Sequence, residues 1–330
     1  MPTYTEKRIN EFKTGDYVSG VFYIRESELK TTTTNNKYMN FTFADKTGEI
    51  NAKLWDWDTD NASRFPAGVL VKARGNVLDW QGQAQFKIES ISKVIDSDNV
   101  KISDYIPSAP YSGEAMYKFL ITVIQDKMQD EDFKKITEYI LEQNKSMLLI
   151  APAAKKNHHA VRSGLLYHTS TMLRAAVTLS SIYTFLNRDL LYAGVMLHDI
   201  GKLFEMKQTD IGLVSEYTTE GTLLGHIIQG INYIDSIGST LGTDPEKVLL
   251  LKHMILSHHY IPEHGSPKPP AFPEAELLHY LDILDARMYD MQMAIDTTET
   301  GTFSDRIWSL ENRSVYKSSA IYEKRQDDTV

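Results

Sequence analysis

The pattern of apolar and polar positions changes its period near residue 100. From about residue 12 to residue 94, short runs alternate apolar with polar residues, which is typical of half-buried β-strands. The sequence Asp45-Lys-Thr-Gly48 predicts a tight turn between the second and third runs, and Trp80-Gln-Gly82 predicts another between the fourth and fifth. Five strands of this length fit a small barrel. We predict them at residues 17–24, 38–45, 50–55, 69–78 and 83–94.

Beyond the strands, apolar residues recur at helical spacing. Asp244-Pro-Glu and Phe272-Pro-Glu place proline at a first helical position with an acid behind it, as helix starts favour. We therefore expect a barrel domain over residues 1–98, a linker over residues 99–111 and an all-helical domain over residues 112–330. The predicted helices cover residues 112–128, 130–141, 165–179, 188–198, 222–237, 245–258 and 273–293.

Composition narrows the classes of protein that this chain can represent. A formal charge of -9 argues against a protein that coats nucleic acid through a large basic surface, because such binding depends on Lys and Arg. No apolar stretch approaches the length of a membrane span, and the first ten residues do not resemble an export signal. The absence of cysteine excludes disulfides, iron–sulfur clusters and thiol catalysis, and it fits a reducing, cytoplasmic location.

The histidines are confined to the second half of the chain. All ten lie at or after residue 158, and the strongest local signal is His198-Asp199 at the end of an apolar helix. Burying this pair without partners would be costly, whereas a metal ion would satisfy both. Together with this pair, each of four other predicted helices carries one candidate ligand, at intervals of 24 to 32 residues. These candidates are His168, His226, His258 and Asp282. Helical bundles bring such ligands together in their cores.

Imidazole and carboxylate ligands suit Mn, Fe, Co, Ni or Zn. Four of these residues would hold one ion, and all six, with Asp199 as a bridge, would be enough for two. Each residue also has a simpler interpretation. A His-Asp dipeptide is often a solvated helix end, and His168 alone could be an interfacial helix histidine. Asp285 and His279 are alternatives to Asp282.

Aromatic residues mark adjacent strands of the predicted barrel. Phe41 and Phe43 share one face, as do Trp55 and Trp57, so one pair should be core. The other pair, with Tyr38 and Trp80, would form a platform on which bases stack, worth roughly 1 to 3 kcal/mol per base. The alternative is that these aromatics fill the barrel. Nearby phosphate contacts are offered by Lys37, Lys53, Arg74 and Lys87.

Several motifs together resemble a known family. The ordered histidines and acids, with Gly-Leu-Leu-Tyr-His168-Thr and His198-Asp-Ile-Gly-Lys202, look like an HD-superfamily metal-dependent phosphohydrolase. The run starting at Tyr38 resembles an OB-fold signature. With Asn157-His-His-Ala160 and Leu278-His-Tyr-Leu-Asp282-Ile-Leu-Asp285, the chain resembles the YhaM family of 3′-to-5′ exoribonucleases over nearly its whole length.

The resemblance implies an N-terminal five-stranded OB-fold barrel followed by an HD-domain helical bundle. It implies a homo-oligomeric exonuclease that uses two Mn²⁺ ions, or Fe, Ni, Co or Zn, to release nucleoside 5′-monophosphates from single-stranded RNA, with single-stranded DNA as a second substrate. Asp199 and Lys202 would be catalytic. The metal ligands would be His168, His198, Asp199, His226, His258 and Asp282. Substrate contacts would come from His158, His159, Arg162, His259, Tyr38, Phe41, Trp55 and Trp80.

Some assignments stay open at this point. His159 could equally support a metal ligand from behind. Two rival functions are an HD phosphohydrolase of free or cyclic nucleotides, and a non-catalytic protein that binds a single strand or a DNA element.

Overall fold

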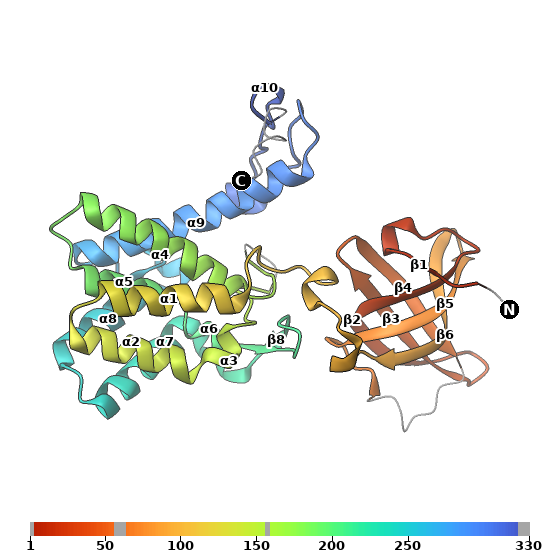
Figure 1. The fold of residues 1–330 in the computed structure, drawn as a ribbon, viewed down its shortest axis with the longest axis horizontal. Helices are drawn as coiled ribbons and strands as arrows, with labels where there is room; N and C mark the ends of the chain where they lie inside the picture. The colour runs from red at the N-terminus through yellow and green to blue at the C-terminus, as the bar shows by residue number, and fades with distance from the viewer. Residues whose placement is uncertain (1–2, 56–63, 156–158, 323–330) are drawn as a thin grey trace. The chain divides into compact units, whose positions relative to one another are not determined.

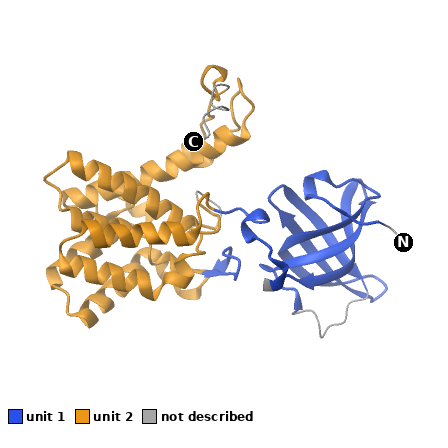
Figure 2. Ribbon diagram, viewed as in Figure 1, with its two compact units in different colours: residues 1–108, 207–216 blue, residues 109–206, 217–330 orange. Residues whose placement is uncertain are grey.

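The computed structural model describes residues 3–55, 64–155 and 159–322 (Figure 1). They form two compact units (Figure 2). One unit comprises residues 1–108 and 207–216, and the other comprises residues 109–206 and 217–330. The chain therefore leaves the helical unit once, for ten residues, and returns to it.

The first unit is a closed β-barrel, as the alternating pattern predicts. Its strands run in the order β1-β2-β3-β4-β6-β5, and pairing of β2 with β5 closes the sheet. The short β1 pairs parallel with β2 at the edge, outside the five-stranded closure. This is the topology of an OB-fold. The strands are β1 (Thr5–Glu6), β2 (Tyr17–Thr31), β3 (Lys37–Asp45), β4 (Gly48–Trp55), β5 (Leu70–Trp80) and β6 (Gln83–Lys93).

Alternation along β3 and β4 separates the barrel core from its outer face. Phe41 lies opposite Ala52 and Phe43 opposite Ile50, and all four side chains are buried. The predicted turn between these strands is present, because the Asp45 carboxylate accepts hydrogen bonds from the backbone N–H groups of residues 47 and 48. Residues at the alternate positions of these strands, such as Tyr38 and Trp55, therefore face outward.

A β-hairpin that the sequence pattern did not predict interrupts the helical half of the chain. It consists of β7 (Met206–Gln208) and β8 (Val214–Tyr217). At its tip, Ile211 is only 6% exposed and packs with Leu70 and Ile106 in a small apolar cluster of the first unit. Gly68 makes room for it, since a Cβ there would lie 2.3 Å from the Thr209 side chain.

The second unit is helical, and all seven predicted helices are present with ends shifted by a few residues. Ser112, Asp130 and Asn187 cap helices with their side chains, as short polar residues favour. Among the described residues, no helix has the length and apolarity to cross a membrane. The helices are α1 (Gly113–Lys127), α2 (Glu131–Gln143), α3 (Lys145–Leu148), α4 (Gly164–Ile182), α5 (Arg188–Leu197), α6 (Lys202–Glu205), α7 (Thr219–Leu241), α8 (Pro245–Ser257), α9 (Pro273–Thr297) and α10 (Ser319–Tyr322).

The described chain ends in a segment that we call the C-terminal arm, residues 298–322. It follows α9 and contains the 3-10 turn η6 (Trp308–Leu310) and α10 (Figure 1). Two antiparallel bridges, Phe303 with Tyr316 and Ile307 with Arg313, fold it back on itself. The apolar pattern gave no helix or strand for this segment.

Candidate metal centre

The six residues expected to be ligands meet inside the helical unit. His168 lies on α4, His198 ends α5, His226 lies on α7, His258 ends α8 and Asp282 lies on α9. Asp199 follows His198 directly. Helix α5 is buried along residues 190–197, so its end delivers His198 and Asp199 into the middle of the bundle.

One group of donor atoms gathers around the Nε2 atom of His168. It lies 3.3 Å from Nε2 of His198 and 3.2 Å from Oδ1 of Asp282. Oδ2 of Asp199 lies 3.3 Å from Nε2 of His198. These four side chains present nitrogen and oxygen atoms at spacings that one divalent cation could bridge.

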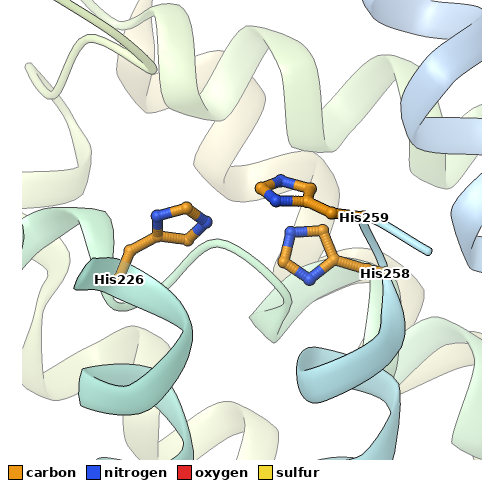
Figure 3. A group of neighbouring side chains, drawn as sticks. All are labelled: His226, His258 and His259. Atoms are coloured by element: carbon orange, nitrogen blue, oxygen red, sulfur yellow. The ribbon is translucent and has the colours of Figure 1, made fainter. Parts of the chain in front are cut away.

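A second group faces the other oxygen of Asp199. Oδ1 lies 3.6 Å from Nε2 of His226 and 3.9 Å from Nε2 of His258. His259 joins them, and the three rings gather between α7 and the end of α8 (Figure 3). The two carboxylate oxygens of Asp199 thus face two separate groups of imidazoles.

Every histidine in these groups is held from behind through its Nδ1 atom. Nδ1 of His168 lies 2.7 Å from Oδ2 of Asp285, and Nδ1 of His226 lies 3.3 Å from Oε1 of Glu205. For His198, His258 and His259, Nδ1 donates to a backbone carbonyl at 2.9, 2.7 and 2.6 Å respectively. Such partners fix the tautomer and direct Nε2 toward the shared centre.

Three of the facing atoms have no partner within the part of the chain that the structure describes. They are buried and accept or donate no hydrogen bond: Oδ1 of Asp199 and the Nε2 atoms of His226 and His258. Leaving buried polar atoms unpaired costs roughly 1 to 3 kcal/mol each. A cation would satisfy all three at once, so the residues present fit a metal ion.

The charge balance leaves Asp199 ionised and His258 neutral, as metal ligands must be, whereas His168 would release a proton when it binds a cation. Burial opposes ionisation of Asp199, but the Lys202 ammonium and the adjacent His198 imidazole outweigh it and hold the pKa well below its usual range. Burial lowers the pKa of His258 well below normal, so its ring is neutral near pH 7. Burial disfavours the charged form of His168, yet Asp282 and Asp285 outweigh it and raise the pKa to about 9.

Two glycines allow α7 to approach the end of α5. Gly225, just before His226, has a φ of 69° and kinks the helix. A Cβ on Gly201 would lie 2.0 Å from the carbonyl oxygen of His226. A side chain at Gly201 would therefore push against the backbone of His226, whereas at Gly225 the obstacle is backbone strain at its positive φ.

Lys202 and the acids of α9 occupy distinct places around the centre. Nζ of Lys202 lies 2.6 Å from Oδ2 of Asp199, which places its charge beside the shared carboxylate. Asp282 faces Nε2 of His168, whereas Asp285 lies behind the ring, so the geometry favours Asp282 over Asp285 as a ligand. His279 donates from Nδ1 to the carbonyl oxygen of His258 at 2.7 Å and supports that ligand from outside.

The expected substrate contacts near residue 160 have different surroundings. His159 is buried, and its Nε2 lies 2.8 Å from Oδ2 of Asp285, which matches the alternative role of supporting a ligand. Burial lowers the pKa of Arg162, and its Nη1 has no hydrogen-bond partner among the described residues. His158 lies outside the described residues. The sequence gave no signal for Glu205, which holds His226 from seven residues beyond His198.

On the barrel, the outer face of β3, β4 and β5 carries an aromatic platform. The rings of Tyr38 and Trp55 stack with centroids 4.8 Å apart, and Trp80 is 59% exposed. Nζ of Lys53 lies 5.3 to 5.8 Å from all three ring centroids. Phe41 is a correction to the expected contacts, because it is 0% exposed within the barrel core and cannot reach a base. Trp57 lies outside the described residues.

Comparisons with known proteins give consistent results. The model of the HD domain family matches residues 165–287. The 3′-5′ exoribonuclease YhaM of Geobacillus sp. (strain WCH70) is 41% identical over 324 residues, which cover 97% of this chain and 98% of that protein.

Two solved structures share a short stretch of similarity with this chain. A domain of replication protein A from Methanococcus maripaludis is 18% identical, with 27% of this chain and 96% of that chain covered and a TM-score of 0.23. The replication factor A related protein of Methanobacterium thermoautotrophicum is 19% identical, with 29% and 96% covered and a TM-score of 0.25. The identity to the Geobacillus protein along almost the whole of both chains carries the assignment: this chain belongs to the YhaM family of 3′-5′ exoribonucleases.

Proposed function

We propose that this chain is a metal-dependent exonuclease that shortens single-stranded RNA from its 3′ end and releases nucleoside 5′-monophosphates. The observation that carries the proposal is the position of Asp199. Its two carboxylate oxygens face two groups of buried imidazoles whose Nε2 atoms converge on it.

Two divalent ions fit this arrangement, with manganese as the first candidate. His168, His198, Asp199 and Asp282 would hold one ion, and Asp199, His226 and His258 the other. His259 belongs to the second group by position. It would serve as its third imidazole as well as contacting the substrate. When bound, such ions stabilise charge on the phosphate and lower the pKa of water to the range where it becomes a nucleophile.

The remaining polar side chains act on the substrate or on the ligands. Lys202 keeps positive charge beside Asp199, where it would stabilise negative charge developing on the scissile phosphate. The guanidinium of Arg162, with Nη1 unpartnered in the described structure, is suited to a backbone phosphate. Asp285 and Glu205 hold His168 and His226 in place.

The barrel supplies a second, less specific contact with the strand. Tyr38, Trp55 and Trp80 offer ring faces to bases, and Lys53 places a cation above the same rings for the backbone. Since every base has a π-face, single-stranded DNA should also bind. A cytoplasmic location, supported by the lack of cysteine, and assembly into a homo-oligomer complete the proposal.

The decisive experiment incubates 5′-labelled single-stranded RNA with the protein and Mn²⁺. The wild type should produce a ladder that shortens from the 3′ end, and Asp199→Ala should produce none. Asp296→Asn, an exposed acid on α9, is the matched control and should behave as the wild type. A ladder that persists in Asp199→Ala, or hydrolysis of free nucleotides with no shortening of RNA, would contradict the proposal.

A further inference from the structure

A pocket of about 360 Å³ lies between the C-terminal arm and the body of the helical unit. Its walls come from three separate segments: the chain before α4, the last turns of α9, and η6. The volume lies within the range of small-molecule sites. The lining residues are Ala160, Val161, Tyr289, Asp290, Met293, Trp308 and Ser309.

Trp308 is 77% exposed at the base of η6 in the C-terminal arm. Two residues further on, Leu310 is fully buried. Arg287 on α9 makes a two-pronged ion pair with Glu311, at 2.6 and 3.0 Å. A large exposed indole at the edge of a pocket is suited to stacking on a flat ligand.

The charge of the pocket lining indicates which part of a nucleotide can bind there. Asp290 is its charged group, and none of the described residues that line it is Lys, Arg or His. A carboxylate repels phosphate, whereas it accepts a hydrogen bond from an amino group on a base. The pocket therefore suits a nucleobase, with its sugar and phosphate outside.

A series of ring contacts leads from the pocket wall to the metal centre. Tyr289, which lines it, lies with its ring centroid 4.0 Å from that of His159. The His159 ring lies 5.3 Å from the ring of His168, and both are hydrogen-bonded to Asp285. Arg162, the candidate for a backbone phosphate, is the next residue after Val161 of the pocket wall.

We propose that this pocket is a nucleobase subsite, in which one base near the 3′ end of the RNA stacks on Trp308 while the chain is being shortened. The proposal rests on the exoribonuclease function and adds the position that holds the strand on the helical unit. It is separate from the stacking platform of the barrel. The stripe of exposed apolar residues on α9, which includes Tyr280 and Leu284, lies on a different face of that helix.

The test combines an arm variant with an RNA that lacks one base. For short RNA, Trp308→Ala should raise KM on the order of tenfold, as loss of one base stack does, with little change in kcat. Trp308→Phe should restore most of the affinity. Phe185→Ala, which removes a 73% exposed aromatic from the loop after α4, should change neither constant.

An abasic ribose placed at successive positions from the 3′ end should identify the base concerned. In the wild type, one position should raise KM about as much as Trp308→Ala does, and in Trp308→Ala that position should have no further effect. An effect of equal size in both proteins would overturn the subsite. The same holds if KM rises only because Trp308→Ala dissociates an oligomer in sedimentation velocity, since the arm would then bind a second copy. Failure of the exonuclease proposal is distinguishable, because the wild type itself would not shorten RNA.

Discussion

At the scale of single residues, the metal centre depends on atoms that point away from it. Each imidazole uses Nδ1 to bond a partner behind it, and only two of these partners are side chains, Asp285 and Glu205. Backbone carbonyls cannot be removed by substitution, so these two acids are the places where the support can be tested.

We predict that Asp285→Asn weakens metal binding roughly 10- to 100-fold, the usual effect of removing a partner behind a ligand. The amide keeps the volume of the side chain but removes the charge that holds His168 and His159. Metal content after dialysis and a calorimetric titration with Mn²⁺ measure the change, with Asp296→Asn as the control. Unchanged affinity would mean that Asp285 does not position His168.

The aromatic residues of the barrel separate stability from binding. We predict that Phe41→Ala lowers the free energy of unfolding by about 3 to 5 kcal/mol, because it leaves a cavity in the core. Trp80→Ala should leave stability nearly unchanged and weaken RNA binding. Urea denaturation and fluorescence anisotropy with labelled RNA measure the two effects. The reverse assignment of effects would show that the outer face is not the platform.

These aromatics also show what a residue pattern can predict. Period-two alternation shows that Phe41 and Phe43 share a face, as do Trp55 and Trp57, but it does not say which face is inside. Closure of the barrel decides that, through the pairing of β2 with β5, which joins residues far apart in the sequence. The six expected ligands could be found because each of five successive predicted helices carries one candidate, or the adjacent pair His198-Asp199, at regular intervals along the chain. Glu205 and Asp285 could not be assigned as supports, because only the packed bundle brings them to their histidines.

At the scale of elements, the ends of helices determine the site more than their middles do. Helical periodicity predicted α7, but the kink at Gly225 and the close contact at Gly201 depend on how α7 packs against the end of α5. The pattern therefore gave the element and missed the distortion that positions His226.

We predict that Gly201→Ala reduces kcat/KM by about 100-fold, because the new methyl group would displace the backbone of His226 and small misplacements are that costly. Gly242→Ala is the matched control. Gly242 has a φ of 64° with nothing near its Cβ position, so alanine there should cost about 1 to 2 kcal/mol in stability and leave activity intact. Wild-type activity in Gly201→Ala would contradict the tight packing.

At the scale of the whole molecule, the barrel unit is built from two separate stretches of the sequence. The hairpin of β7 and β8 lies within the part of the sequence that matches the HD domain, yet its tip belongs to the barrel unit. Its strands are too short for a clear periodicity, which is why continuous boundaries at residues 98 and 112 were expected.

We predict that Ile211→Ala lowers the stability of the barrel unit by about 2 to 5 kcal/mol, since it empties part of the cluster with Leu70 and Ile106. Unfolding followed by Trp80 fluorescence, in a variant with the other tryptophans replaced by phenylalanine, reports on that unit. An unchanged barrel transition would contradict this assignment.

Removal of metal should lower the stability of the helical unit. At a concentration of 100 times its dissociation constant, a bound ion stabilises the folded state by about 2.7 kcal/mol. Chelation should therefore lower the melting temperature of the helical unit by several degrees and leave the barrel transition in place. Scanning calorimetry with and without EDTA measures both. Equal shifts in both transitions, or none, would argue against a metal centre confined to the helices.

The excursion of residues 207–216 also limits how such a protein can be rearranged. A gene fusion made at the linker would carry the barrel without the hairpin tip that packs against it, and would leave Ile211 without its neighbours. Chimaeras between relatives should therefore fold only when the barrel and this insertion are taken from the same parent.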